Sequence, residues 1–166
     1  MPVRPTPQRP GPGQESVWDY PRPPALQRSS ERVVVRFADR VVAESTAPWR
    51  VLETSHPPVY YLPRDDVDTT LLVPSERVTI CEFKGAARYA DLVVGDRRSP
   101  LACWWYPDPV ASFAALAGAV AFYPHRVDEV RVDDEVVRAV QGDFYGGWVT
   151  SRVVGPFKGG PGTAGW

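Results

Sequence analysis

A succession of short β-branched runs separated by turn residues begins at Arg32 and constrains the fold most strongly. Residues 33, 35 and 37 (Val, Val, Phe) alternate with Arg32, Val34 and Arg36, which is the two-residue period of a half-buried strand. Residues 38–40 can turn the chain into a second strand at 41–43, so we predict a hairpin. Further strands are predicted at 58–62, 77–83, 89–94, 101–106, 118–123, 127–132 and 135–140.

Only residues 109–117 have a helical pattern. Asp108 can accept a hydrogen bond as the N-cap, and Pro109 suits the first helical position. One face would carry Phe113, Leu116, Ala117 and Val120. A single helix beside many strands excludes a doubly wound nucleotide-binding fold. We therefore expect a mainly β protein, with a small antiparallel two-sheet domain and one short helix.

The two ends of the chain differ in composition from its middle. Residues 1–30 hold eight of the 19 prolines, so we expect a disordered or polyproline-like leader; the alternative is a docking peptide around Trp18-Asp19-Tyr20. Residues 31–141 would form the β domain. Residues 142–166 hold eight of the 13 glycines among several aromatic residues. We expect this tail to dock on the domain, with a mobile ligand-gripping tail as the alternative.

The charge balance narrows the classes of partner. Lys and Arg number 19 against 20 Asp and Glu, for a formal net charge of -1, so a polybasic protein that binds nucleic acid polymers is not expected. No apolar run approaches the roughly 20 residues that span a bilayer. We expect a soluble, cytoplasmic protein without a membrane partner.

Metal and cofactor signatures are weak. The two cysteines (Cys81, Cys103) and two histidines (His56, His125) do not form the spaced pairs of a zinc site. Phosphate-cradling glycine loops and the GxSxG nucleophile elbow are also absent from the sequence. We therefore expect neither a metal nor a cofactor.

A first polar cluster occupies residues 52–67. Its prolines stiffen the backbone, so Glu53, Tyr61 and Arg64 would be presented in fixed positions. The alternative is that the tyrosines only pack and that Glu53 and Arg64 pair with each other or with neighbours. His56 is more readily explained as a structural residue.

A second cluster, at residues 81–89, contains Lys84. If the strand continues past Ile80 with period two, Glu82 and Lys84 follow its apolar face. An inward lysine must extend to solvent, find an anion or lose its proton. The alternative is that Gly85 breaks the register and leaves Lys84 in solvent. Cys81 is read as a buried structural residue rather than a nucleophile.

A third cluster combines Trp104, Trp105 and Tyr106 with Tyr123. These rings could line a pocket for a flat ligand or simply fill the core. The tripeptide Phe-Lys-Gly occurs at 83–85 and again at 157–159 with unlike flanks, which we interpret as coincidence rather than duplication.

At these motifs the chain resembles a bacterial and fungal family catalogued as domain of unknown function number 427, which carries a nucleotidyltransferase label. The resemblance runs from about residue 33 to 128 and is carried by Leu-Glu-Thr at 52–54, Pro-Pro-Val-Tyr-Tyr at 57–61, Phe-Lys-Gly at 83–85, Trp-Tyr-Pro at 105–107 and Phe-Tyr-Pro at 122–124. It implies a β-tent-like architecture. Zinc in proteins of that architecture sits on CxxC pairs that this chain lacks. Magnesium for nucleotidyl transfer would need carboxylates, and the nearest, Asp65, Asp66 and Asp68, are read as a solvated turn.

The leading hypothesis is a small-molecule pocket centred on Lys84, for an unidentified ligand such as a nucleotide or another anion. Glu53 and Tyr61 would orient Lys84, and these three form the candidate catalytic set. The candidate ligand-binding residues are Tyr60, Arg64, Cys81, Tyr89, Trp105 and Tyr123. The alternatives are an enzyme of nucleotidyltransferase type, with Glu53 or Tyr61 as acid/base, and a noncatalytic protein-interaction module. The oligomeric state is left open.

Overall fold

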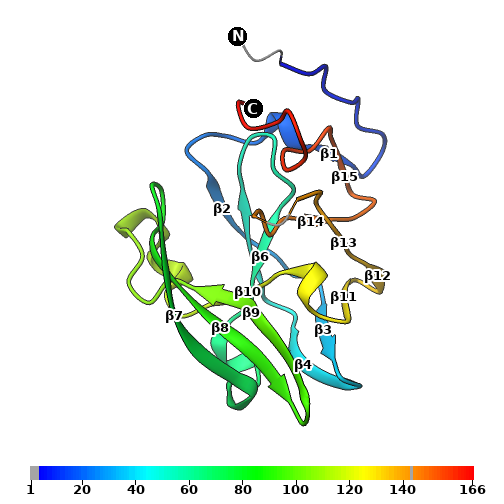
Figure 1. Ribbon diagram of the computed structural model, residues 1–166. Coiled ribbons are helices and arrows are strands. Elements are labelled where there is room, and N and C mark those ends of the chain that lie inside the picture. Colours follow the sequence, from blue (N-terminus) through cyan, green and yellow to red (C-terminus); the bar gives the residue numbers. More distant parts are fainter. Residues whose placement is uncertain (1–3, 143) are drawn as a thin grey trace.

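Antiparallel sheets dominate the computed structural model, which describes residues 4–142 and 144–166. Three larger sheets and two short strand pairs make up its β structure in these residues. Figure 1 shows the long hairpins of one sheet on one side and strands β1 and β15 side by side near the opposite end. The prediction of a mainly β protein is confirmed, whereas the prediction of only two sheets is wrong.

The first sheet has the strand order β10-β9-β8-β7 and carries the long hairpins. Its strands are β7 (Leu72–Cys81), β8 (Gly85–Val94), β9 (Arg97–Trp105) and β10 (Val120–Phe122). Register shifts interrupt both the β7–β8 and the β8–β9 pairing. Such irregularities bend a sheet.

The second sheet has the order β12-β11-β3-β4. Its strands are β3 (Val33–Phe37), β4 (Arg40–Ser45), β11 (Glu129–Val132) and β12 (Glu135–Val136). The predicted hairpin is confirmed in β3 and β4. Its turn residues Ala38 and Asp39 both have positive φ, at 52° and 60°, which suits a tight hairpin turn whose twist matches the flanking strands.

The third sheet, β2-β5-β6, was predicted only in part. It consists of β2 (Ala25–Arg28), β5 (Trp49–Leu52) and β6 (Val59–Tyr61), of which only β6 falls in a predicted strand, at 58–62. Two short pairs complete the β structure of the described residues: β1 (Glu15–Ser16) runs parallel to β15 (Val153–Val154), and β13 (Arg138–Ala139) pairs with β14 (Trp148–Val149). The strands that were not predicted (β1, β2, β5, β14 and β15) have two to four residues, which carry little periodicity.

The short helix is a 3-10 segment rather than an α-helix starting at Pro109. It is η4 (Ala111–Leu116), and Phe113 within it has a non-helical φ of -116°. The start is delayed because Val110 is extended and its N–H donates to the Lys84 carbonyl at 2.9 Å. Phe113 and Leu116 are buried as predicted, whereas Ala117 is exposed and Val120 belongs to β10 instead of the helix. The remaining 3-10 turns are η1 (Val17–Asp19), η2 (Arg64–Asp66), η3 (Thr69–Leu71) and η5 (Pro124–Arg126).

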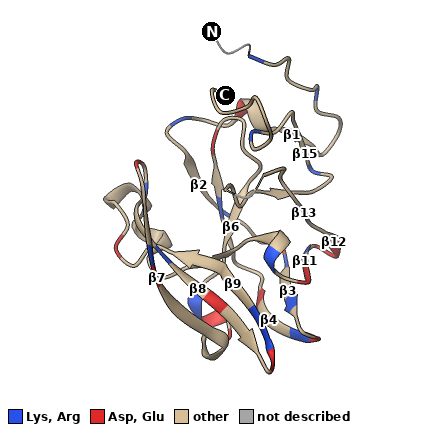
Figure 2. Ribbon diagram, viewed as in Figure 1, with Lys and Arg blue, Asp and Glu red and all other residues tan. Residues whose placement is uncertain are grey.

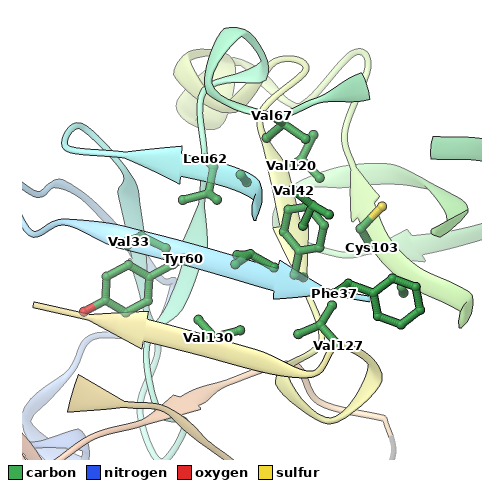
Figure 3. Close-up of a cluster of buried hydrophobic side chains, with 14 of the residues drawn as sticks. Val33, Phe37, Val42, Tyr60, Leu62, Val67, Cys103, Val120, Val127 and Val130 are labelled. Atoms are coloured by element: carbon green, nitrogen blue, oxygen red, sulfur yellow. The ribbon is translucent and has the colours of Figure 1, made fainter. Parts of the chain in front are cut away.

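The largest core cluster lies between the first and second sheets. Figure 3 shows Val33 and Phe37 of β3, Val42 of β4 and Val130 of β11 in this cluster, together with Cys103 of β9. These side chains are almost completely buried, and the alternation of strand residues explains which of them face inward. A second cluster covers the other face of the first sheet and borders the candidate site.

The leader is folded in its described part, which corrects the prediction of disorder. Val17 is fully buried, and Trp18 donates its Nε1–H to the Pro156 carbonyl at 2.9 Å. The Trp18 ring also lies 5.7 Å from that of Trp166. The prediction failed because the apolar surface that covers the leader comes from the opposite end of the sequence.

Charged residues are distributed without a dominant sign. Figure 2 shows acidic and basic positions interspersed along the strands of the second sheet and the long hairpins. Arg97 with Asp128, and Arg32 with Glu44, are typical exposed pairs. Within the described residues, no helix has the length and apolarity needed to cross a membrane.

Candidate functional site

A cavity of about 490 Å³ opens against the first sheet. Its walls come from β5 and β6, from the β7–β8 hairpin, from β9 and from the C-terminal segment. Six of the predicted site residues line it: Glu53, Tyr61, Cys81, Lys84, Tyr89 and Tyr123. The cavity therefore joins the first polar cluster of the sequence to the second and third.

Lys84 lies in the turn between β7 and β8. The expectation that it continues the strand is wrong, because β7 ends at Cys81 and Gly85 adopts a φ of +113°. The side chain nevertheless turns inward and is only 9% exposed. Glycine suits this position because the left-handed region penalises residues with a Cβ.

The Lys84 ammonium group contacts rings rather than carboxylates. Its Nζ lies 5.9 Å from the Tyr106 ring centroid and 6.0 Å from that of Phe113. No hydrogen bond or ion pair of this group is found among the described residues. A cation that is largely removed from water thus faces an open cavity with only weak cation–π partners.

The inner wall is a group of hydrogen-bonded aromatic side chains. Trp104 donates its Nε1–H to the Tyr61 hydroxyl at 3.2 Å, and the Trp104 and Tyr123 rings lie 4.5 Å apart. Burial raises the pKa of Tyr61, of Tyr106 and of Tyr123 above the ordinary tyrosine value. These hydroxyls remain protonated at neutral pH and serve as hydrogen-bonding groups.

Tyr89 and Thr79 continue this wall onto the neighbouring strands. Tyr89 of β8 is buried, and its hydroxyl lies 2.8 Å from the Thr79 Oγ1. Either hydroxyl could be the donor of this bond. Arg77 stacks over the Tyr89 ring at 5.4 Å, so a cation covers the outer side of the wall.

Glu53 does not orient Lys84, which corrects that prediction. Its carboxylate pairs with Arg22 at 3.2 Å and lies 3.8 Å from His56 Nδ1. Arg22 belongs to the leader, and it also donates to the Thr54 carbonyl at 2.9 Å. The prediction failed because a residue of the segment taken for a tail provides the counterion.

His56 lines the cavity, although the sequence favoured a structural role for it. Nδ1 lies 2.9 Å from the Thr54 carbonyl, and since a carbonyl only accepts, Nδ1 carries the proton. Burial is the main cause that lowers the His56 pKa; nearby Lys158 and Arg22 act in the same direction, whereas Glu53 and the Thr54 bond oppose them. The ring is therefore neutral at pH 7, with the lone pair on Nε2.

Three predicted ligand-binding residues lie away from the cavity. Tyr60 belongs to the main core, where its ring stacks on Trp148 at 4.8 Å and its hydroxyl donates to Glu31. Arg64 lies over the Trp105 ring at 5.0 Å, and Trp105 packs against the same main core. Since successive strand residues point to opposite faces, Trp104 takes the place predicted for Trp105.

The two cysteines differ in their surroundings. Cys81 is half-buried and lines the cavity, whereas Cys103 is completely buried in the main core. Burial raises the pKa of the Cys103 thiol to about 12, so that thiol stays protonated. Both thiols are free.

The C-terminal segment closes the cavity with residues that the sequence did not assign to it. Tyr145 lies 4.9 Å from the His56 ring, edge to face, and Lys158 Nζ lies 5.6 Å from the Tyr145 ring centroid. Lys158 also donates to the Trp166 carbonyl at 3.3 Å. Two signals pointed to this segment: the alternative of a ligand-gripping tail at residues 142–166 and the repeated Phe-Lys-Gly tripeptide.

The acidic residues considered for magnesium lie outside the cavity lining. Asp66 accepts a hydrogen bond from Ser45 at 2.7 Å, and Asp68 pairs with Arg40 at 2.9 Å. Within the described residues, no three His, Cys, Asp or Glu side chains gather as a metal-binding group would.

The comparisons with known proteins define the class of this chain. Residues 25–133 match the family model described as a domain of unknown function, DUF427. The chain belongs to this family. No curated protein matches it. The matched region includes Glu53, His56, Tyr61, Lys84 and Trp104, whereas Tyr145 and Lys158 lie beyond it.

Proposed function

We propose that the protein binds a small organic anion in the cavity, with Lys84 as the group that contacts its negative charge. The observation that carries this proposal is the ammonium group of Lys84, 9% exposed and without an ion-pair partner in the described residues. Burying an uncompensated ammonium ion costs several kcal/mol. A bound carboxylate or phosphate would restore the missing partner through a charge-assisted hydrogen bond.

The aromatic wall indicates what the rest of the ligand is like. Trp104, Tyr106 and Tyr123 line the cavity, and the Trp104 Nε1–H is engaged by the Tyr61 hydroxyl. Rings of this kind stack on flat or apolar groups. The volume of about 490 Å³ lies within the usual range for small-molecule sites, roughly 300 to 1,000 Å³. A nucleotide is one member of the class of flat anions that this combination suits.

The two rival functions have less support. Nucleotidyl transfer would draw on acidic residues to hold magnesium, and Asp66 and Asp68 are engaged with Ser45 and Arg40 away from the cavity. An interaction module would use the leader and the tail, yet Trp18 is bound within the molecule itself. The β-tent relationship of the sheets stays a prediction.

Ligand binding can be tested with two simple anions, benzoate and phenyl phosphate. We expect both to raise the melting temperature of the wild type and to shift the NMR signals of cavity residues, because ligands that bind only the native state stabilise it. Lys84→Met should abolish both effects. The control is Arg28→Met, which removes a positive charge that lies over Trp49 and does not line the cavity.

Two results would contradict the proposal. One is binding of either anion with equal affinity by the wild type and by Lys84→Met. The other is a loss of binding in Arg28→Met as large as that in Lys84→Met, which would show that the effect depends only on net charge.

A further inference from the structure

We propose that the ligand of the cavity is a dianion, held by Lys84 on one side and by Lys158 on the other. This inference rests on the proposed function and narrows its substrate class from any small anion to one that carries two negative charges. Both residues line the same cavity of about 490 Å³.

The first argument is the distribution of lysine. The chain contains two lysines against 17 arginines, and both lysines line this cavity. An ammonium group is a compact point charge with three donors, whereas guanidinium is a broad planar fork. Lysine is therefore used at the two cavity positions, although arginine supplies the positive charge at every other basic position of the sequence.

The second argument is the absence of internal counterions. At least eight arginines pair with carboxylates within 4.0 Å, as Arg22 does with Glu53. In the part of the chain that the structure describes, neither lysine has an Asp or Glu side chain within that distance. The protein thus pairs much of its arginine charge with acidic side chains and leaves both lysines without such a counterion.

Lys158 is held in position and still has donors to spare. Its backbone N–H donates to the Ser55 carbonyl at 2.8 Å, which ties the C-terminal segment to the loop that carries His56. Its Nζ donates to the Trp166 carbonyl at 3.3 Å and lies near the Tyr145 ring. One hydrogen bond leaves two of the three ammonium donors for a ligand.

The other charged groups of the cavity do not replace the missing anion. The Glu53 carboxylate is engaged by Arg22, and Glu82 is an exposed residue of the hairpin turn. His56 is neutral, so it adds no further positive charge. The cavity therefore presents two ammonium groups without an acidic side-chain partner, and a dianion would pair with both.

The test compares three anions that share one benzene ring and differ in charge. Benzoate carries one carboxylate, terephthalate carries two at opposite ends of the ring, and phenyl phosphate carries both charges on one group at pH 8. Dissociation constants are measured by NMR titration for the wild type, Lys84→Met, Lys158→Met and Lys158→Arg. The native spectrum and melting temperature of each variant establish that it is folded.

We expect the wild type to bind at least one dianion about tenfold more tightly than benzoate, since a single charged hydrogen bond accounts for a factor of that order. Lys158→Met should remove this preference and leave benzoate binding unchanged within about twofold, because benzoate needs only Lys84. Lys158→Arg should retain part of the preference. A preference for terephthalate indicates two separated anionic groups, and one for phenyl phosphate indicates a single phosphate shared by both lysines.

The outcomes separate this inference from the proposed function. Equal affinity of the wild type for benzoate and both dianions overturns the inference and leaves the proposed function intact. The inference also fails if Lys158→Met weakens benzoate and the dianions by the same factor. If no probe binds the wild type, or if Lys84→Met binds all of them normally, the proposed function fails and the inference fails with it.

Discussion

Replacing Lys84 with methionine should stabilise the ligand-free protein while it abolishes binding. The side chain is 9% exposed, and its ammonium group contacts only the Tyr106 and Phe113 rings, at 5.9 and 6.0 Å. Methionine fills a similar volume without a charge. Replacing a residue that stabilises the fold should lower the free energy of unfolding, whereas replacing a residue retained for ligand binding can raise it.

The size of the effect follows from three contributions. Each cation–π contact is worth about 0.5 to 1 kcal/mol, and both lie near the roughly 6 Å limit of the interaction, so about 1 kcal/mol is lost. Removing the buried, unpaired ammonium group stabilises the folded protein by several kcal/mol. A sulfur–ring contact adds about 0.3 to 1.5 kcal/mol. We expect a net gain of at least about 1 kcal/mol, and each kcal/mol raises the melting temperature of a chain of this size by roughly 2 to 4 °C.

Urea unfolding, followed by tryptophan fluorescence and circular dichroism, measures this gain as a higher midpoint with an unchanged slope. Lys158→Met is the matched control, because it removes the only other lysine together with its hydrogen bond to the Trp166 carbonyl. That variant should be equal to the wild type or slightly less stable. A loss of more than about 1 kcal/mol in Lys84→Met would refute the reasoning, since it would make the ammonium a stabilising group.

Three further predictions concern the walls, the leader and the buried hydroxyls. Benzoate should quench the tryptophan fluorescence of Trp105→Phe but not that of Trp104→Phe, because Trp104 lines the cavity and Trp105 does not. Quenching in Trp104→Phe alone would show that the ligand binds elsewhere. Trp18→Ala should lower the free energy of unfolding by about 3 to 5 kcal/mol, and a loss below about 1 kcal/mol in urea unfolding would contradict the docking of the leader. At least five of the seven tyrosines should resist ionisation near pH 10 in a 295 nm titration, because burial raises their pKa. Since the pKa of these tyrosines is higher in the folded protein than in the unfolded chain, the protein should lose stability as the pH rises above about 10. Full ionisation of the tyrosines in the native protein at pH 10 would contradict the raised pKa values. These tyrosines are Tyr20, Tyr60, Tyr61, Tyr106 and Tyr123.

Part of the site was readable from local pattern. The alternation of apolar and polar residues predicted the β3–β4 hairpin. It also predicted an inward Lys84, and that side chain is buried although β7 ends at Cys81 and does not continue to it. The same alternation could have separated Trp104 from Trp105, since Cys103 was already assigned to the core and Trp105 shares its face. That error came from choosing a residue by type rather than by register.

The counterions could not be read in this way. Glu53 pairs with Arg22, 31 positions earlier in the chain, and Trp18 bonds to the Pro156 carbonyl, 138 positions away. No local propensity encodes such partners, because they depend on how the ends of the chain return to the sheets. For the same reason the leader was taken for a disordered segment.

The amino-acid sequence by itself determined the β class and the main hairpin, because these depend on residues close together in the chain. Tertiary structure alone decided that Lys84 is buried beside Tyr106 and Phe113, and that His56, Tyr145 and Lys158 meet it around one cavity. The two Phe-Lys-Gly tripeptides lie at 83–85 and 157–159, and only the packing of the C-terminal segment against the loop at Ser55 brings their lysines to the same cavity. Contacts between such distant segments are set by the packing of the whole chain and not by the residues beside each lysine.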